Sequence, residues 1–333
     1  MPYLAEVVLH RACFVLCLAL FASATTFAQD YPVKPIKVIV SFPPGNSADL
    51  IARAVSERLA QRLGQAVVVE NRGGAGGIIG MEQLARSAPD GYTIGITSLS
   101  PISIIPAVNR KLRYDPMRDL QPITLLAEGP MVLIATNALA PNSVAELIAY
   151  AKANPGKLSY GSLGPGTISQ LTMEMFKQAT GANIVEVPYK GSSQAITDLI
   201  AGHLDLLFDN PASSVPQVKS GRVKAIATSR KKREASLPEV PTLEESGIAG
   251  LKDFYPAGWI GALLPAGTPP AITHRLNAEL TQALAAEDVR ARITAGGLDV
   301  APANSSEQFR EYIQKDFAKW SKVARDAKIE MPD

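Results

Sequence analysis

The sequence has few of the residues that most enzymes and metal proteins use. Its 333 residues include three histidines, two cysteines and two tryptophans, and only 6% are aromatic. Both cysteines, Cys13 and Cys17, lie in an apolar N-terminal stretch, so the rest of the chain has no thiol, disulfide or cysteine-ligated metal. The two histidines beyond that stretch, His203 and His274, belong to no cluster with the spacing of metal ligands. We therefore expect no metal site.

The chain also lacks an excess of charge of either sign. Lysine and arginine total 33 and aspartate and glutamate 31, which gives a net charge of +2 and no basic surface for nucleic acid. With 47% hydrophobic and 19% charged residues, the composition is that of a globular protein, and the length suits roughly two domains. This composition excludes disorder and does not favour nucleic-acid binding.

The N-terminal segment has the pattern of a secretory signal peptide. Residues 12–24 are apolar, follow Arg11 and end in small residues. Cleavage after Ala28 or after Ala24 fits equally well. A membrane anchor is the weaker interpretation, because a spanning segment needs about 20 apolar residues. We assign residues 1–28 to the signal peptide and expect the mature protein in a bacterial periplasm.

Beyond this segment, short apolar runs alternate with longer amphipathic stretches. This alternation is typical of an α/β fold. The predicted strands are residues 36–41, 66–70, 93–97, 132–136, 158–161, 183–187, 204–208 and 258–264. The predicted helices are residues 48–63, 78–87, 145–153, 168–180, 194–201, 270–284, 288–295 and 306–325. We expect two lobes, each a mainly parallel sheet flanked by helices.

The C-terminal helices follow a single strand, so they need another sheet to cover. We expect them to return to the first sheet, with the chain crossing between lobes near residues 126–131 and 254–261. Residues 29–128 and 258–333 then form one lobe, and residues 129–257 form the other. Two crossings make a hinge, and we expect the ligand in the cleft between the lobes.

The chain has no recognisable catalytic or nucleotide-binding motif. A Gly-x-Ser-x-Gly elbow is absent, and neither histidine lies in a setting typical of a catalytic base. The glycine cluster at residues 73–77 has Ile79 where a dinucleotide fingerprint needs its third glycine, so it is predicted to be a turn. Residues 161–167 lack the lysine of a phosphate loop. We expect neither an enzyme nor a bound cofactor.

The turns that follow the strands suit anion binding instead. In open α/β sheets, ligands bind beyond the carboxyl ends of the strands, where helix N-terminal N–H groups and small hydroxyls hold carboxylates. Residues 43–47 and 161–167 each join a strand to a helix. The candidate hydroxyl donors are Ser47, Thr97, Ser98, Ser100, Ser162 and Thr167.

Two aspartates lie at the same edges, and each has two interpretations. Asp209 follows the apolar run 204–208 and either touches the ligand or its waters, or caps the following helix. Asp49 either does the same or only favours the dipole of its helix.

Short motifs of a distinctive kind occur along the chain from end to end. They are Tyr31-Pro32, Phe42-Pro43-Pro44-Gly45 with Ala48-Asp49, Glu70-Asn71-Arg72 with Gly74-Ala75-Gly76-Gly77, Pro89-Asp90-Gly91-Tyr92-Thr93, Tyr160-Gly161-Ser162 with Gly166-Thr167, Val187-Pro188-Tyr189-Lys190-Gly191, Phe208-Asp209, Val240-Pro241-Thr242 and Pro265-Ala266-Gly267-Thr268-Pro269. As a set in this order, they are highly specific. Through them the sequence resembles the solute receptors of tripartite tricarboxylate transporters, the Bug-type periplasmic binding proteins.

The resemblance implies two α/β lobes of the periplasmic-binding-protein type (type II-like), no catalysis, and capture of a small carboxylate for a membrane permease. The implied solutes are di- or tricarboxylates, amino acids or aromatic acids. The ligand contacts it implies are Phe42, Gly45, Asn46, Ser47, Asp49, Thr97, Ser98, Ser162, Gly166, Thr167 and Asp209. The alternative function is a sensor that docks onto a histidine kinase. We expect a monomer.

Two residues depart from the pattern of this family. Asn46 stands where members usually have a second glycine, and Gln170 where they usually have a histidine. The Asn46 side chain could either bond the ligand or fill the pocket and select a smaller solute. Gln170 is expected to be structural.

Overall fold

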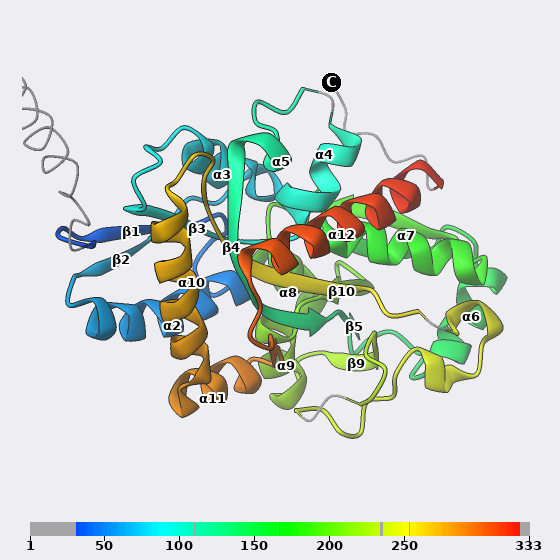
Figure 1. Ribbon diagram of the computed structural model, residues 1–333. Coiled ribbons are helices and arrows are strands. Elements are labelled where there is room, and N and C mark those ends of the chain that lie inside the picture. The colour runs from blue at the N-terminus through cyan, green and yellow to red at the C-terminus, as the bar shows by residue number, and fades with distance from the viewer. Residues whose placement is uncertain (1–30, 110, 165, 234–235, 253, 327–333) are drawn as a thin grey trace, which may run out of the picture. The chain divides into compact units, whose positions relative to one another are not determined.

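The strands form two separate sheets, as the alternation of strands and helices predicts (Figure 1). The computed structural model describes residues 31–109, 111–164, 166–233, 236–252 and 254–326. The predicted signal peptide, residues 1–28, and both cysteines lie outside these residues. The described residues from Lys34 to Asp326 belong to one compact unit. The described residues 31–33 lie outside that unit and belong to no helix or strand.

In the described part of the chain, the first sheet has six strands in the order β11-β4-β10-β3-β1-β2. β1 runs parallel to β2 and β3, whereas β10 runs antiparallel to β3 and β4, and β11 antiparallel to β4. The strands are β1 (Ile36–Val40), β2 (Val67–Asn71), β3 (Thr93–Ser98), β4 (Leu120–Pro130), β10 (Ala257–Pro265) and β11 (Asp299–Val300).

The second sheet has five strands in the described residues, in the order β7-β6-β8-β5-β9. β6 runs parallel to β7 and β8, and β5 runs antiparallel to β8 and β9. The strands are β5 (Val132–Ala135), β6 (Leu158–Ser162), β7 (Ile184–Pro188), β8 (Leu206–Asp209) and β9 (Lys224–Thr228).

The two sheets flanked by helices confirm the α/β prediction, but both sheets are mixed and not mainly parallel. The cause is the way in which the chain crosses between them. β4 ends at Pro130 and β5 begins at Val132, with one residue between them, and β10 returns beside β4 with Ala257 opposite Pro130. Because one strand leads away from the first sheet and the other leads back, they pair antiparallel.

Helices flank both sheets (Figure 1). We call the first sheet with its helices lobe 1. These helices are α2 (Ser47–Leu63), η1 (Ala75–Gly77), α3 (Ile78–Ala85), η2 (Ser100–Ile104), α4 (Ile105–Val108), α5 (Pro116–Asp119), α10 (Pro270–Ala285), α11 (Glu287–Ala295) and α12 (Ser306–Asp326). Lobe 2 is the second sheet with α6 (Val144–Ala153), α7 (Ile168–Thr180), α8 (Ser192–Ala201), α9 (Pro211–Lys219), η3 (Glu244–Ser246) and η4 (Ala249–Leu251). The residue boundaries of the lobes stay a prediction.

The C-terminal helices pack back onto lobe 1. α10 contacts α2 and β4, α11 contacts α2, and α12 contacts β4 and η2. In Figure 1, α12 is the red helix that extends toward α7, which it also contacts. Its Asp316 accepts hydrogen bonds from the indole N–H groups of Trp259 (2.7 Å) and Trp320 (2.9 Å), and both rings are buried. α12 thus fixes a strand residue, Trp259, that lines the cavity described below.

The core of lobe 2 follows the alternation of side chains along β5. Leu133 and Ala135 pack with residues of α6 and α7 on one face, and Val132 and Ile134 pack with residues of α8 and α9 on the other. A strand that is buried on both faces reads as a continuous apolar run. This explains why β5 could be predicted from hydrophobicity alone.

Ser229 joins the two crossing segments. Its hydroxyl donates to the Pro256 carbonyl (2.5 Å) and accepts from the Met131 N–H (2.8 Å), and its own N–H donates to the Met131 carbonyl (2.9 Å). Ser229 therefore hydrogen-bonds to both segments that connect the two sheets.

Candidate ligand-binding site

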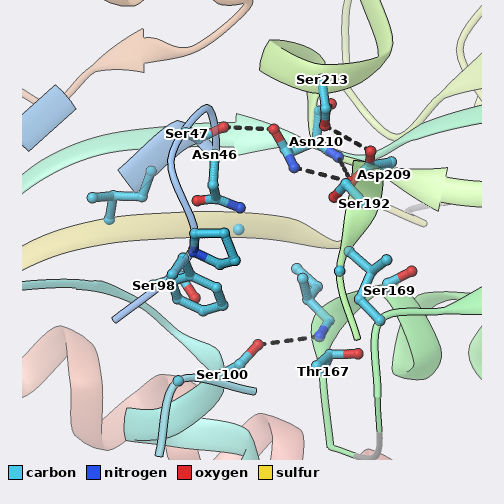
Figure 2. A pocket seen from close by; sticks show the side chains of 18 of the residues that line it. Asn46, Ser47, Ser98, Ser100, Thr167, Ser169, Ser192, Asp209, Asn210 and Ser213 are labelled. Atoms are coloured by element: carbon cyan, nitrogen blue, oxygen red, sulfur yellow. Dashed lines mark hydrogen bonds between the residues drawn. The ribbon is translucent and has the colours of Figure 1, made fainter. Parts of the chain in front are cut away.

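A cavity of about 370 Å³ lies between residues of lobe 1 and residues of lobe 2. Its volume is in the range of small-molecule sites. Lobe 1 contributes the loop after β1, the end of β3 with η2, and parts of the crossing strands. Lobe 2 contributes the beginnings of α7, α8 and α9 (Figure 2). Apolar side chains, among them Leu99, Met131, Leu163 and Trp259, form much of the wall.

The residues that begin four helices line this cavity. They are the N-cap residues Asn46 of α2, Thr167 of α7, Gly191 of α8 and Asn210 of α9. Each helix directs the positive end of its dipole and its unpaired first-turn N–H groups toward its N-cap. Four such ends around one cavity favour an anionic ligand.

Several first-turn N–H groups have no partner in the protein. Neither Thr167 nor Gly191 caps its helix with a side chain. Among the described residues, the N–H groups of Ser192, Ser193 and Gln194 in α8 have no hydrogen-bond partner. All three residues line the cavity, so a ligand oxygen can accept from this turn.

Asp209 lies at the lobe 2 wall and accepts four hydrogen bonds. Its Oδ1 accepts from Ser192 Oγ (2.8 Å), from the Asn210 N–H (2.8 Å) and from Asn210 Nδ2 (2.9 Å), and its Oδ2 accepts from Ser213 Oγ (2.6 Å). The side chain is fully buried, and burial raises its pKa to about 6, although each of these bonds lowers it. Asp209 therefore organises three neighbouring side chains that face the cavity.

Two hydrogen bonds connect the lobes across the cavity. Ser47 Oγ donates to Asn210 Oδ1 (2.7 Å), and the Ile168 N–H donates to Ser100 Oγ (3.3 Å). Figure 2 shows them on opposite sides of the cavity. The orientation of the Asn210 amide follows from Asp209, because a carboxylate pairs with the amide N–H and leaves Oδ1 to face Ser47.

The loop after β1 is held rigidly. Asp49 Oδ2 accepts from the Gly45 N–H (3.0 Å), and its Oδ1 accepts from Asn71 Nδ2 (2.9 Å) and Arg53 (3.0 Å). Burial acts to raise the pKa of Asp49, but the bonds from Arg53, Gly45 and Asn71 together hold it below its usual value. Asn71 Nδ2 also donates to the Phe42 carbonyl (3.0 Å), so the end of β2 braces this loop.

The structure brings most of the predicted site residues together. Seven of them line the cavity: Phe42, Gly45, Asn46, Ser47, Ser98, Thr167 and Asp209. Ser100, a further candidate donor, lines it as well. Whether they contact a ligand stays a prediction.

Four of the predicted ligand-contacting residues are not among those that line the cavity: Asp49, Thr97, Ser162 and Gly166. The Asp49 carboxylate faces its own loop, as described above. Thr97 precedes Ser98 on β3, so its side chain points to the opposite face, where its hydroxyl bonds Ser41 (2.6 Å). Ser162 is fully buried, and the Gly166 N–H donates to Gln170 Oε1 (2.8 Å). Their direct contact with a ligand is not supported by this arrangement.

Sequence reasoning missed part of the lining. The glycine cluster, predicted to be a turn, contributes Gly74, Gly76 and Gly77, all with positive φ. Gly76 has φ 65°, in the left-handed region that favours glycine, and a Cβ there would lie 2.8 Å from Ile105 Cδ1, the movable end of a side chain. Further lining residues that were missed include Leu99, Gly129, Met131, Leu163, Ser169, Gly191, Ser192, Ser193, Gln194, Asn210, Ser213, Trp259 and Leu298. Serines and glycines at helix starts carry no specific signal, and only the fold places them here.

Gln170 supports the site from behind, as expected. Besides holding the Gly166 N–H, it donates through Nε2 to Glu186 on β7 (3.0 Å). Lys190, which lies in the turn before α8, is exposed and lines the cavity. It is the one cationic side chain among the described lining residues.

Other kinds of site find no support in the residues that the structure describes. These residues contain no group of three or more His, Cys, Asp or Glu side chains arranged for a metal ion. None of their helices is long and apolar enough to cross a membrane.

Two α/β lobes joined by crossing strands, with a cavity between them lined by helix N-termini, define a two-lobed solute-binding protein. The chain belongs to the tripartite tricarboxylate transporter family receptors (TctC), whose family model matches residues 51–329. It is thus a solute receptor and not an enzyme, as the sequence predicts.

Several relatives cover nearly the whole chain. Protein BugT of Bordetella pertussis is 35% identical over 305 residues, which cover 91% of this chain and 92% of BugT. The structure of R. palustris Rpa4515 with adipate has a TM-score of 0.85 at 33% identity and covers 90% of this chain and 99% of that chain. MatC from Rhodopseudomonas palustris with bound malate has a TM-score of 0.81 at 31% identity, with 88% and 99% covered. These likenesses confirm the predicted family and fold.

Proposed function

We propose that this protein is a periplasmic receptor that binds a small carboxylated solute in the cavity between its lobes and delivers it to a tripartite tricarboxylate-type membrane permease. The observation that carries the proposal is the set of four helix N-caps around the cavity, with unpaired N–H groups in the first turn of α8. Such groups bind carboxylates without a cationic side chain.

The relatives point to the same class of ligand. One solved structure holds adipate and another holds malate, and both are dicarboxylates. A cavity of about 370 Å³ suits ligands of this size, and its apolar wall suits the methylene groups between two carboxylates. Di- and tricarboxylates, amino acids and aromatic acids form the range that we propose.

Membership of the family supports the proposals of delivery to a permease and location in the periplasm. The family consists of transporter receptors, so we propose transport and not the alternative, sensing through a histidine kinase. Uptake of labelled ligand by membrane vesicles that contain the permease should require added receptor. Uptake at the same rate without the receptor would contradict delivery.

A thermal-shift screen of the purified protein against small carboxylates tests the binding proposal. A ligand at 100 times its Kd stabilises the protein by about 2.7 kcal/mol, which raises Tm by several degrees. Protein that has been unfolded and refolded serves as the control for ligand carried over from expression. A dose-dependent rise in Tm with a carboxylate supports the proposal. A flat screen with refolded protein would contradict it.

A further inference from the structure

We propose that Asn46 selects the ligand: its amide NH₂ group donates to a second acceptor group, so the preferred solute carries a carboxylate and, at its other end, a second carboxylate or a carbonyl. This inference rests on the proposed function, the binding of carboxylates in the cavity. It assigns to one side chain the choice between dicarboxylates and monocarboxylates.

The N-cap bond of Asn46 fixes which end of its amide faces the ligand. Its Oδ1 accepts from the Ala48 N–H (2.9 Å) at the start of α2. Among the described residues, its Nδ2 has no hydrogen-bond partner. The half-buried side chain lines the cavity, and Figure 2 shows it on the same side of the view as the lobe 1 residues Ser47 and Ser98. The cavity therefore receives a donor and not an acceptor from Asn46.

The position of this donor is set before a ligand arrives. Asp49 holds the preceding Gly45 N–H, and Asn71 holds both Asp49 and the Phe42 carbonyl. A donor held in its binding geometry loses little freedom when the ligand binds. The NH₂ group can therefore discriminate between ligands.

The opposite wall supplies the other half of the recognition. The unpaired N–H groups of α8 belong to lobe 2, whereas Asn46 belongs to lobe 1. A ligand with acceptors at both ends can satisfy both walls at once. A monocarboxylate leaves one of these two sets of cavity donors without a ligand partner, and a site built to bond a polar group rejects ligands that lack it.

Two variants separate the donor from the N-cap. Asn46→Ser keeps a capping oxygen and removes the NH₂ group, and Asn46→Asp keeps the cap and the shape but replaces the donor with a carboxylate oxygen. Asn109→Asp is the matched control. Asn109 Oδ1 accepts from the Lys111 N–H (2.8 Å) two residues on, as in the Asn46–Ala48 pair, but Asn109 does not line the cavity.

Isothermal titration calorimetry with succinate, adipate, butyrate and hexanoate provides the test. A hydrogen bond to a charged group is worth roughly a 10- to 100-fold change in Kd. We expect the wild type to prefer the better diacid over its monoacid by at least this factor. Asn46→Ser should lose that preference by weakening diacid binding alone, and Asn46→Asp should weaken diacid binding further. Asn109→Asp should leave every Kd unchanged.

Three results would overturn the inference. Equal affinity of the wild type for diacids and monoacids would show that no second acceptor is recognised. Unchanged diacid affinity in Asn46→Ser, with the Tm of the unliganded protein retained, would make Asn46 a helix cap only. In both cases the proposed function survives. If no carboxylate of any kind binds the wild type, the proposed function and this inference fail together.

Discussion

The buried carboxylate of Asp209 should make the protein less stable at neutral pH than at acidic pH. Burial raises its folded-state pKa from 3.8 to about 6. A group with a raised folded-state pKa contributes stability below its unfolded pKa, near 3.8, and this contribution is lost as pH rises through about 6. A shift of about 2 units corresponds to about 3 kcal/mol of unfolding free energy at pH 7. The dipoles of α8 and α9, which favour the ionised form, make this figure an upper limit.

The variant Asp209→Asn removes the titration and keeps the network. Within the described part of the chain, Asp209 Oδ2 accepts from Ser213 Oγ alone, and a hydroxyl can accept a hydrogen bond as well as donate one. The introduced amide can therefore donate to Ser213 while its oxygen still accepts from Ser192 and the Asn210 N–H. We expect the variant to be more stable than the wild type at pH 7 by up to about 3 kcal/mol, and equally stable below pH 4.

Urea denaturation without ligand, at pH values from 4 to 8, measures this difference. The control is Asp90→Asn, because Asp90 is half-exposed and pairs with Lys34 on the surface (3.3 Å). Its stability difference should stay within about 0.5 kcal/mol at every pH. A stability difference for Asp209→Asn that is zero at pH 7, or that does not change with pH, would refute the reasoning.

Three further substitutions have expected outcomes. Ser47→Ala removes one of the two hydrogen bonds that connect the lobes across the cavity, worth about 1 kcal/mol, and should speed ligand release roughly fivefold in stopped-flow measurements, with unchanged release contradicting this role. Ser143→Ala removes the α6 cap at the Glu146 N–H (3.2 Å) and should cost about 1 kcal/mol in urea denaturation without changing ligand affinity. Asp316→Ala leaves the indole N–H groups of Trp259 and Trp320 without their acceptor. It should lower the free energy of unfolding in urea by about 2 to 4 kcal/mol. A loss under about 1 kcal/mol would show that water replaces the carboxylate as the acceptor.

Periodicity in the sequence was sufficient for most of the strands and helices, but it missed β4, β9 and α9. β4 contains Pro122 and Gly129, and the sequence predicts a crossing segment at residues 126–131, whereas residues 126–130 belong to this eleven-residue strand. α9 contains Pro211 and Pro216 and few apolar residues, so it has little helical signal. The antiparallel pairing of β4 with β10 depends on where the chain crosses, which local pattern does not specify.

The sequence located the site by its strand ends but could not say which side of each loop faces the ligand. Ser98 lines the cavity and its neighbour Thr97 does not, because adjacent side chains of a strand point to opposite faces. The contributions of Ser192 and Asn210 arise from contacts among Asp209, α8 and α9 that no motif encodes. Long-range packing, and not local sequence, decides these positions.

A crystal structure of the protein with the carboxylate that gives the largest thermal shift tests the central claim most directly. We predict the ligand in the cavity, with one carboxylate within hydrogen-bond distance of the N–H groups of Ser192, Ser193 or Gln194. A ligand bound outside the cavity, or one whose carboxylates touch none of the four helix N-termini, would contradict the account.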